Sequence, residues 1–242
     1  MKLQVDSSWQ EIIEYAYSGL SSEYRKFLET NKGYFPTYTN FLNAFHTLSL
    51  EKTKYILFGQ DPYPRVKSAS GYAFIDKNVK NLFSEKGFSK EVNKATSLRN
   101  FLKMLLLSEG YLESNDLSQN AISKISKDKF IDSIDELRCN FERNGVLLLN
   151  TALIFTCKED TKLHVKEFRV FMHRLLSRLA DKNIELILFG AMAKDIKKQL
   201  PCALEFKTVE TLHPYNIGFI HDLRVWSTFA PMNLMYNLPF QQ

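Results

Sequence analysis

Four short apolar runs, separated by segments with helical periodicity, dominate the pattern of hydrophobic and polar positions. The runs cover residues 54–58 (KYILF), 145–149 (GVLLL), 185–189 (ELILF) and 204–208 (LEFKT). The first three are almost uninterrupted, as expected of parallel strands that are covered on both faces. Helical patterns occupy residues 97–107, 130–143, 165–180, 191–200 and 224–236. This alternation predicts a three-layer αβα fold, an α/β class with a central, mainly parallel four-stranded sheet.

The regions outside this alternation are predicted to be helical or irregular. Ser7-Ser8 before Trp9 resembles a capped helix start, and Phe35-Pro36-Thr37 is predicted to open a second helix. A polar stretch at about residues 112–129 predicts a surface insertion, with a hinge or interaction loop as the alternative. We expect one domain over residues 1–242, with N-terminal helices at about 1–50 and this insertion.

Composition and charge narrow the class of protein. Hydrophobic residues make up 45% and charged residues 24%, which is ordinary for a globular protein, and the net charge of +5 suits a polyanionic partner. We find no signal peptide and no run of about 18 apolar residues, so we expect a cytoplasmic protein without membrane association. The three cysteines are far apart, which predicts neither disulfides nor a metal site. A monomer is expected.

Polar residues follow the predicted strands at the points where ligands bind in open parallel sheets. Asp61 follows the first strand, Asn150 follows the second and His213 follows the fourth. Because the carboxyl ends of parallel strands share one edge of a sheet, we expect the three side chains to converge on one cleft. The sequence has no G-x-S-x-G elbow, no phosphate-binding glycine loop and no metal-ligand spacing. The remaining hypothesis is hydrolysis of a bond to a planar heterocycle, without metal or cofactor.

Six segments resemble motifs of the family 1 uracil-DNA glycosylases, in the family's order. They are GQDPYP at 59–64, GYAF at 71–74, SLRNF at 97–101, GVLLLNTALIF at 145–155, ILFGAMAK at 187–194 and HPYNI at 213–217. The resemblance implies an enzyme of base excision repair. Such an enzyme flips uracil out of DNA, cuts its N-glycosidic bond and leaves an abasic site.

The same resemblance implies two catalytic residues and one that reads the base. Asp61 would orient the attacking water and stabilise the oxocarbenium-like sugar. His213, in its neutral form, would donate a hydrogen bond to the departing uracil. Asn150 would pair with the N3–H and O4 edge of uracil, and cytosine would leave this amide unmatched.

Further residues are implied to hold the base and the DNA. Around the uracil these are Phe74, stacked on the ring, Tyr63, placed against C5 so that it excludes thymine, and Gln60, lining the pocket. On the DNA the resemblance implies Ser97 at a phosphate, and Pro214 and Ile217 on the loop that inserts into the helix. Arg65, Lys67 and Arg224 would add salt-dependent affinity.

The chain departs from the family at positions that grip the DNA backbone. Pro64 stands for a histidine, whereas Ala191, Tyr215 and Gly218 stand for serines, and residues 92–96 replace a proline-rich loop. These changes predict an intact base pocket with a weaker DNA clamp. Two alternatives follow: a glycosylase of the same fold with another damaged-base or single-strand preference, and a non-catalytic DNA-binding protein.

Overall fold

The computed structural model describes residues 3–237, so both ends of the predicted 1–242 domain lie outside the described residues. The described chain forms two compact units. The first unit consists of the residues up to Asp76 and residues 145–209, and the second of residues 77–144 and those from 210 onward. The organisation of the chain as a single domain stays a prediction.

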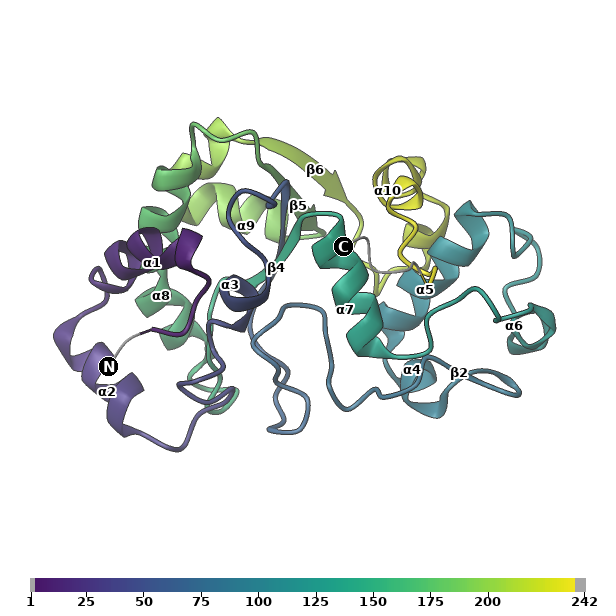
Figure 1. Cartoon of the computed structure of the whole chain (residues 1–242), viewed down its shortest axis with the longest axis horizontal. Coiled ribbons are helices and arrows are strands. Elements are labelled where there is room, and N and C mark those ends of the chain that lie inside the picture. The colour runs from purple at the N-terminus through teal and green to yellow at the C-terminus, as the bar shows by residue number, and fades with distance from the viewer. Residues whose placement is uncertain (1–2, 238–242) are drawn as a thin grey trace. The chain divides into compact units, whose positions relative to one another are not determined.

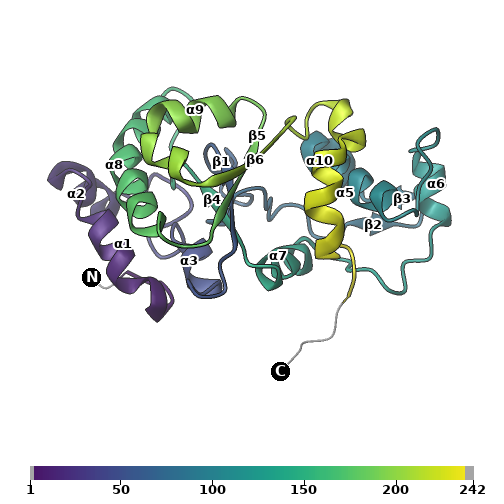
Figure 2. The same cartoon turned by 90° about the horizontal axis from the view of Figure 1, so that it is seen from above.

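A four-stranded sheet carries the first unit. Its strand order is β4 (Val146–Asn150), β1 (Tyr55–Gly59), β5 (Glu185–Phe189) and β6 (Lys207–Thr211) (Figures 1 and 2). β1 pairs in parallel with both β4 and β5. Consecutive residues Ile56, Leu57 and Phe58 are at most 1% exposed, so both faces of the central strand are covered. The predicted three-layer fold around a parallel sheet is confirmed.

Helices flank this sheet. They are α1 (Gln10–Tyr17), α2 (Ser22–Thr30), α3 (Asn43–Thr47), α8 (Thr161–Leu179) and α9 (Met192–Gln199), with 3-10 turns η1 (Ser7–Trp9) and η2 (Pro201–Glu205). α1 packs along α8, α3 contacts β4, and α9 follows β5 directly. α8 has an apolar stripe, including Phe168, Phe171 and Leu175, that is fully buried.

The second unit is mainly helical. It contains β2 (Phe83–Ser84), β3 (Gly87–Phe88), α4 (Lys90–Lys94), α5 (Thr96–Ser108), α6 (Gln119–Lys124), α7 (Ile134–Arg143), η3 (Ile217–His221), α10 (Leu223–Phe229) and η4 (Ala230–Met232). α5 is its central helix, and the ring of Phe101 lies 5.7 Å from that of Phe141 and 5.0 Å from that of Phe229, centroid to centroid. These aromatic contacts join three segments that are far apart in sequence.

Several predicted boundaries are wrong. The fourth strand begins at Lys207 rather than at residue 204, because Pro201 starts the 3-10 turn η2 that extends to Glu205. No helix opens at residues 35–37, since Phe35 forms an isolated antiparallel bridge with Phe155. The helix predicted at 130–143 starts only at Ile134, where Ser133 and Glu136 form a capping box.

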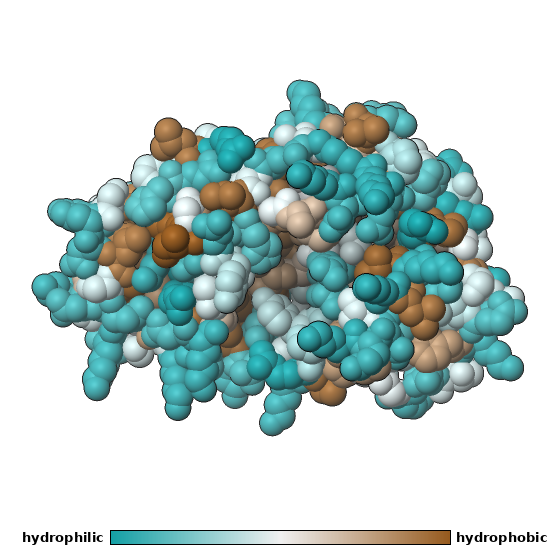
Figure 3. All heavy atoms as spheres, turned by 180° about the vertical axis from the view of Figure 1, so that it is seen from behind, coloured by the Kyte–Doolittle hydropathy of each residue, from teal (hydrophilic) through white to brown (hydrophobic). Residues whose placement is uncertain are grey.

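The surface is mixed in character. Figure 3 shows a face that is mostly hydrophilic, with apolar side chains in several separate areas. None of the helices formed by residues 3–237 is long and apolar enough to cross a membrane.

Candidate active site

β1 and β4 end side by side, at register partners Gly59 and Asn150. Three hydrogen bonds join the loops that follow these strands. Thr151 N–H donates to Gly59 O at 2.9 Å, and the Thr151 hydroxyl donates to Gln60 O at 2.8 Å. Ala152 N–H also donates to Gln60 O, at 2.9 Å. A Cβ at position 59 would collide with Oδ1 of Asn150, so only glycine allows this close approach.

Asn150 is a largely buried residue at this edge. The residue is 5% exposed, and its amide forms no hydrogen bond with residues 3–237. The amide carries both a donor and an acceptor, so a ligand edge with the complementary pair satisfies both at once.

Asp61 lies two residues beyond β1 and is partly buried. Burial raises the pKa of its carboxyl group, and a hydrogen bond from the Thr161 side chain lowers that pKa in part. Thr161 is the first residue of α8, so the start of this long helix positions the carboxylate. A carboxylate held in this way can orient a water molecule or stabilise a neighbouring cation.

A hydrogen bond joins Tyr63 to the backbone of Phe74. The Tyr63 hydroxyl donates to the carbonyl oxygen of Phe74 at 3.3 Å, and burial raises the pKa of Tyr63 to about 12. Phe74 has φ of 67°, in the left-handed region that a bulky residue rarely adopts. Such strain persists where the surroundings enforce it, and Ala73 N–H, bonded to Leu148 O at 3.0 Å, anchors the segment to β4.

In the second unit, α5 holds the loop that carries His213. Asn100 is 2% exposed, and its Nδ2 donates to the carbonyl oxygen of Pro214 at 2.8 Å. Ser97 lies one turn earlier on α5. The residue that caps this helix, Ala95, offers no side-chain hydrogen bond to the first turn. The backbone N–H groups there are therefore oriented to receive an anion.

The hydrogen bonding of His213 indicates its tautomer. Tyr215 N–H donates to Nδ1 of His213 at 3.0 Å, so Nδ1 is an acceptor and the proton of the neutral ring is on Nε2. Protein atoms around the ring displace water, and this burial lowers the pKa of His213 although the residue as a whole is exposed. The neutral ring can thus donate from Nε2 without carrying a full positive charge.

The loop after His213 exposes two large apolar side chains. Ile217 is 65% exposed and Tyr215 is 71% exposed. Asn216 fixes the turn between them, because its side chain accepts from Gly218 N–H at 2.9 Å. An exposed, pre-ordered apolar group of this kind suits insertion between stacked bases.

The structure distributes the predicted site residues over its two units. The first unit brings together Gln60, Asp61, Tyr63, Phe74 and Asn150, and the second holds Ser97, His213, Pro214 and Ile217. The convergence of Asp61 with His213 stays a prediction. Within residues 3–237 no group of three or more His, Cys, Asp or Glu side chains is arranged to hold a metal ion.

Sequence reasoning missed two supporting residues. Thr161 bonds to Asp61 from a segment without a recognisable motif, 100 positions away, so no local signal could identify it. Asn100 belongs to SLRNF, but only the fold shows that its amide supports the loop at Pro214.

Comparisons with known proteins show which proteins the chain as a whole is similar to. No protein-family model matches the chain. The uracil-DNA glycosylase of Borreliella burgdorferi is 25% identical over 91% of this chain and 90% of its own length. That of Francisella philomiragia is 25% identical over 86% of this chain and 84% of its own length.

Solved structures give a stronger match. The crystal structure of UNG from Nitratifractor salsuginis superposes with a TM-score of 0.94, at 45% identity over 96% of this chain and 93% of that one. The mimivirus uracil-DNA glycosylase shares the fold, with a TM-score of 0.57 at 19% identity, covering 88% of this chain and 70% of its own. On the 45% identity over nearly the whole length, the chain belongs to the uracil-DNA glycosylase family.

Proposed function

We propose that this protein excises uracil from DNA by hydrolysing its N-glycosidic bond, as the first step of base excision repair. The observation that carries the proposal is Asn150, a largely buried residue whose side-chain amide forms no hydrogen bond with residues 3–237 and which lies beside the loop of Asp61 at the end of the sheet. Uracil presents an N3–H donor and an O4 acceptor, which match the oxygen and the NH2 group of this amide. Cytosine presents the opposite pattern and leaves the amide unpaired.

The chemical step uses two groups in complementary roles. The bond between C1′ of the sugar and N1 of uracil breaks, and its electron pair leaves with the base. Asp61 stabilises the positive charge that develops on the sugar and orients the water whose oxygen bonds to C1′. His213 donates from Nε2 to the uracil oxygen on which negative charge gathers. The water proton not retained by the product passes to solvent.

The remaining predicted residues bind the base and the DNA. Phe74 stacks on the uracil ring, Tyr63 lies against C5 and Gln60 lines the pocket. The loop with Pro214 and Ile217 fills the space that the flipped base vacates, and Ser97 with the first turn of α5 holds a phosphate. Acceptance of both double- and single-stranded DNA, a monomeric state and a cytoplasmic location are part of this proposal.

An abasic-site assay tests the function. Uracil-containing DNA is incubated with the protein, with and without EDTA, and strand breaks are counted after alkali treatment. We expect release in both conditions. Asp61→Asn should lower kcat by about 10²–10⁴-fold and His213→Ala by about 10²–10³-fold. Asp181→Asn and His221→Ala, which alter exposed residues, are the matched controls. Uracil release by the Asp61 and His213 variants at the rates of their controls would refute these roles.

A further inference from the structure

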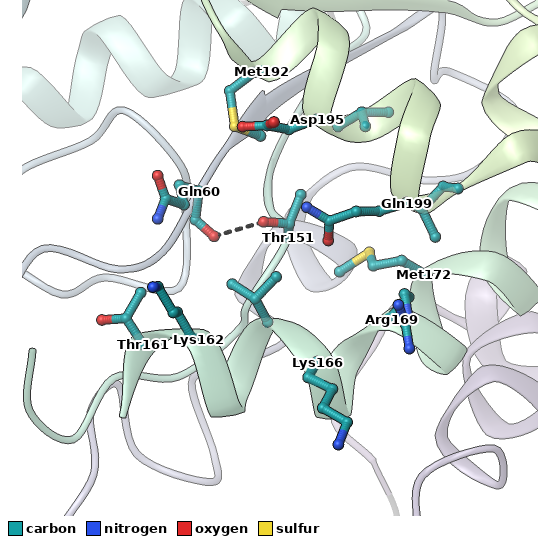
Figure 4. A pocket seen from close by; sticks show the side chains of 13 residues that line it. Gln60, Thr151, Thr161, Lys162, Lys166, Arg169, Met172, Met192, Asp195 and Gln199 are labelled. Carbon is teal, nitrogen blue, oxygen red and sulfur yellow. Dashed lines mark hydrogen bonds between the residues drawn. The ribbon is translucent and has the colours of Figure 1, made fainter. Parts of the chain in front are cut away.

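The first unit contains a cavity of about 300 Å³, and Gln60 is the one lining residue that the proposed reaction also uses. It lies between α8 and α9, and Gln60 and Thr151 from the ends of β1 and β4 close one side (Figure 4). Pockets of this size accept small planar ligands. The cavity is made entirely of residues of this unit, so its shape does not depend on the second unit.

One wall of the cavity carries positive charge without a counter-charge. Lys162, Lys166 and Arg169 lie four and three positions apart, on one face of α8. All three are exposed, and none forms an ion pair or side-chain hydrogen bond with residues 3–237. Figure 4 shows Lys162 extending toward the cavity and Lys166 extending outward from the helix. Asp195 is the acidic residue on the opposite wall, so the lining has an excess of positive charge.

These three cations differ from two that sequence reasoning selected for DNA binding. Arg65 is paired with Asp76 at 3.2 Å, and Arg224 is paired with Asp222 at 2.7 Å. Their charges are partly neutralised within the protein. The uncompensated charge on α8 is therefore the stronger attraction for a polyanion.

The cavity lies beside the loop that carries Asp61. Thr161, which bonds to Asp61, is also part of the cavity lining and directly precedes Lys162. Gln60, the residue before Asp61, lines it as well. A strand whose sugar lies at Asp61 therefore has its neighbouring nucleotide within reach of this cavity.

The interior suits a base rather than a bare ion. Apolar side chains of Val165, Met172, Ile196 and Leu200 line it, together with the amides of Gln60 and Gln199. A phosphate alone gains nothing from apolar walls, whereas a nucleobase has apolar faces and a polar edge that amides can bond.

We propose that this cavity is a nucleotide subsite, which binds the base of the nucleotide next to the flipped uridine, with its phosphate at Lys162, Lys166 and Arg169. The inference rests on the proposed excision of uracil from DNA. It also accounts for Pro64 and Ala191, which stand where the family has side chains that contact the DNA backbone. A phosphate bound on α8 would replace the contacts that are lost at those two positions. Ala191 directly precedes Met192, which lines the cavity.

The charge part of the proposal is tested with the triple variant Lys162→Ala/Lys166→Ala/Arg169→Ala. The matched control is Lys26→Ala/Lys32→Ala/Lys182→Ala. It removes the same number of positive charges, three, from exposed positions elsewhere in the same unit. On single-stranded uracil-containing DNA we expect the cavity variant to raise KM about tenfold with kcat unchanged. The slope of log KM against log salt should fall by about 0.7, the value for one phosphate contact on a single strand. Equal KM values and equal salt slopes for the two triple variants would overturn the proposal.

The base part is tested with oligonucleotides that keep every phosphate. An abasic spacer replaces the nucleotide on the 5′ side of uridine, then the one on the 3′ side. For the wild type we expect KM to rise severalfold with the spacer on one side only, and Gln199→Leu should reduce that difference. A spacer without effect on either side would refute base binding. Absence of uracil release by the wild type itself would instead refute the proposed function.

Discussion

A buried carboxyl group at the end of α5 makes the stability of the second unit dependent on pH. Both oxygens of Glu109 are buried without a hydrogen-bond partner, although the Tyr236 hydroxyl lies nearby. Burial raises the pKa of Glu109 from 4.5 to about 7, and Tyr236 offsets a small part of that rise. The folded protein thus holds a proton that the unfolded chain releases.

The sign and size of the effect follow from linkage. Between pH 4.5 and about 7 the folded state binds more protons than the unfolded state, so stability falls as pH rises through this window and is level above it. The difference between the two pKa values corresponds to at most about 3.4 kcal/mol. Partial access of solvent to the group reduces this to about 1–2 kcal/mol.

Urea denaturation of the wild type and of Glu109→Gln at pH 5 and pH 8 measures this contribution of Glu109 to the free energy of unfolding. The neutral amide has no charge to bury, so the variant should gain about 1–2 kcal/mol over the wild type between the two pH values. Glu113→Gln, at an exposed position of the same unit, is the control and should follow the wild type. If Glu109→Gln shows the same pH dependence as the wild type, the carboxyl group is not protonated in the folded state and the reasoning is wrong.

Three further predictions concern the active site. Thr161→Val removes the hydrogen bond that lowers the pKa of Asp61, so the acid limb of the plot of kcat against pH should move to higher pH. An acid limb at the same pH as in the wild type would contradict this contact. Gly59→Ala places a methyl group against Oδ1 of Asn150 and should lower the rate of uracil release by about 10²-fold, while the circular dichroism spectrum stays unchanged. Full activity of this variant would argue against the close approach of the two residues. Tyr63→Ala opens space at C5 and should permit thymine release, measured on thymine-containing DNA; a variant that still rejects thymine would place Tyr63 elsewhere.

Sequence reasoning succeeded where the physical signal is local. The runs that became β1, β4 and β5 are apolar at nearly every position, because both faces of these strands are covered, and the predicted boundaries differ from the observed ones by at most one residue. The polar residues that follow them, Asp61 and Asn150, could be placed at one edge because parallel strands end together. The short N-terminal elements gave a weaker signal. Helices were expected over about residues 1–50 without separate bounds for α2, and the helix start expected at residues 35–37 is instead a bridge.

The sequence by itself thus determined the fold class, and it placed the candidate residues Asp61 and Asn150 at one edge of the sheet. Only the tertiary structure decided that Thr161 contacts Asp61 and that Asn100 holds the loop of Pro214. It also decided that Nδ1 of His213 accepts a hydrogen bond and that three unpaired cations of α8 lie beside a cavity. The physical reason is the distance along the sequence between the residues that must interact. Periodicity of apolar residues follows from the geometry of one helix or strand, whereas these contacts join segments that are brought together, or surfaces that are left open, by packing of the whole unit.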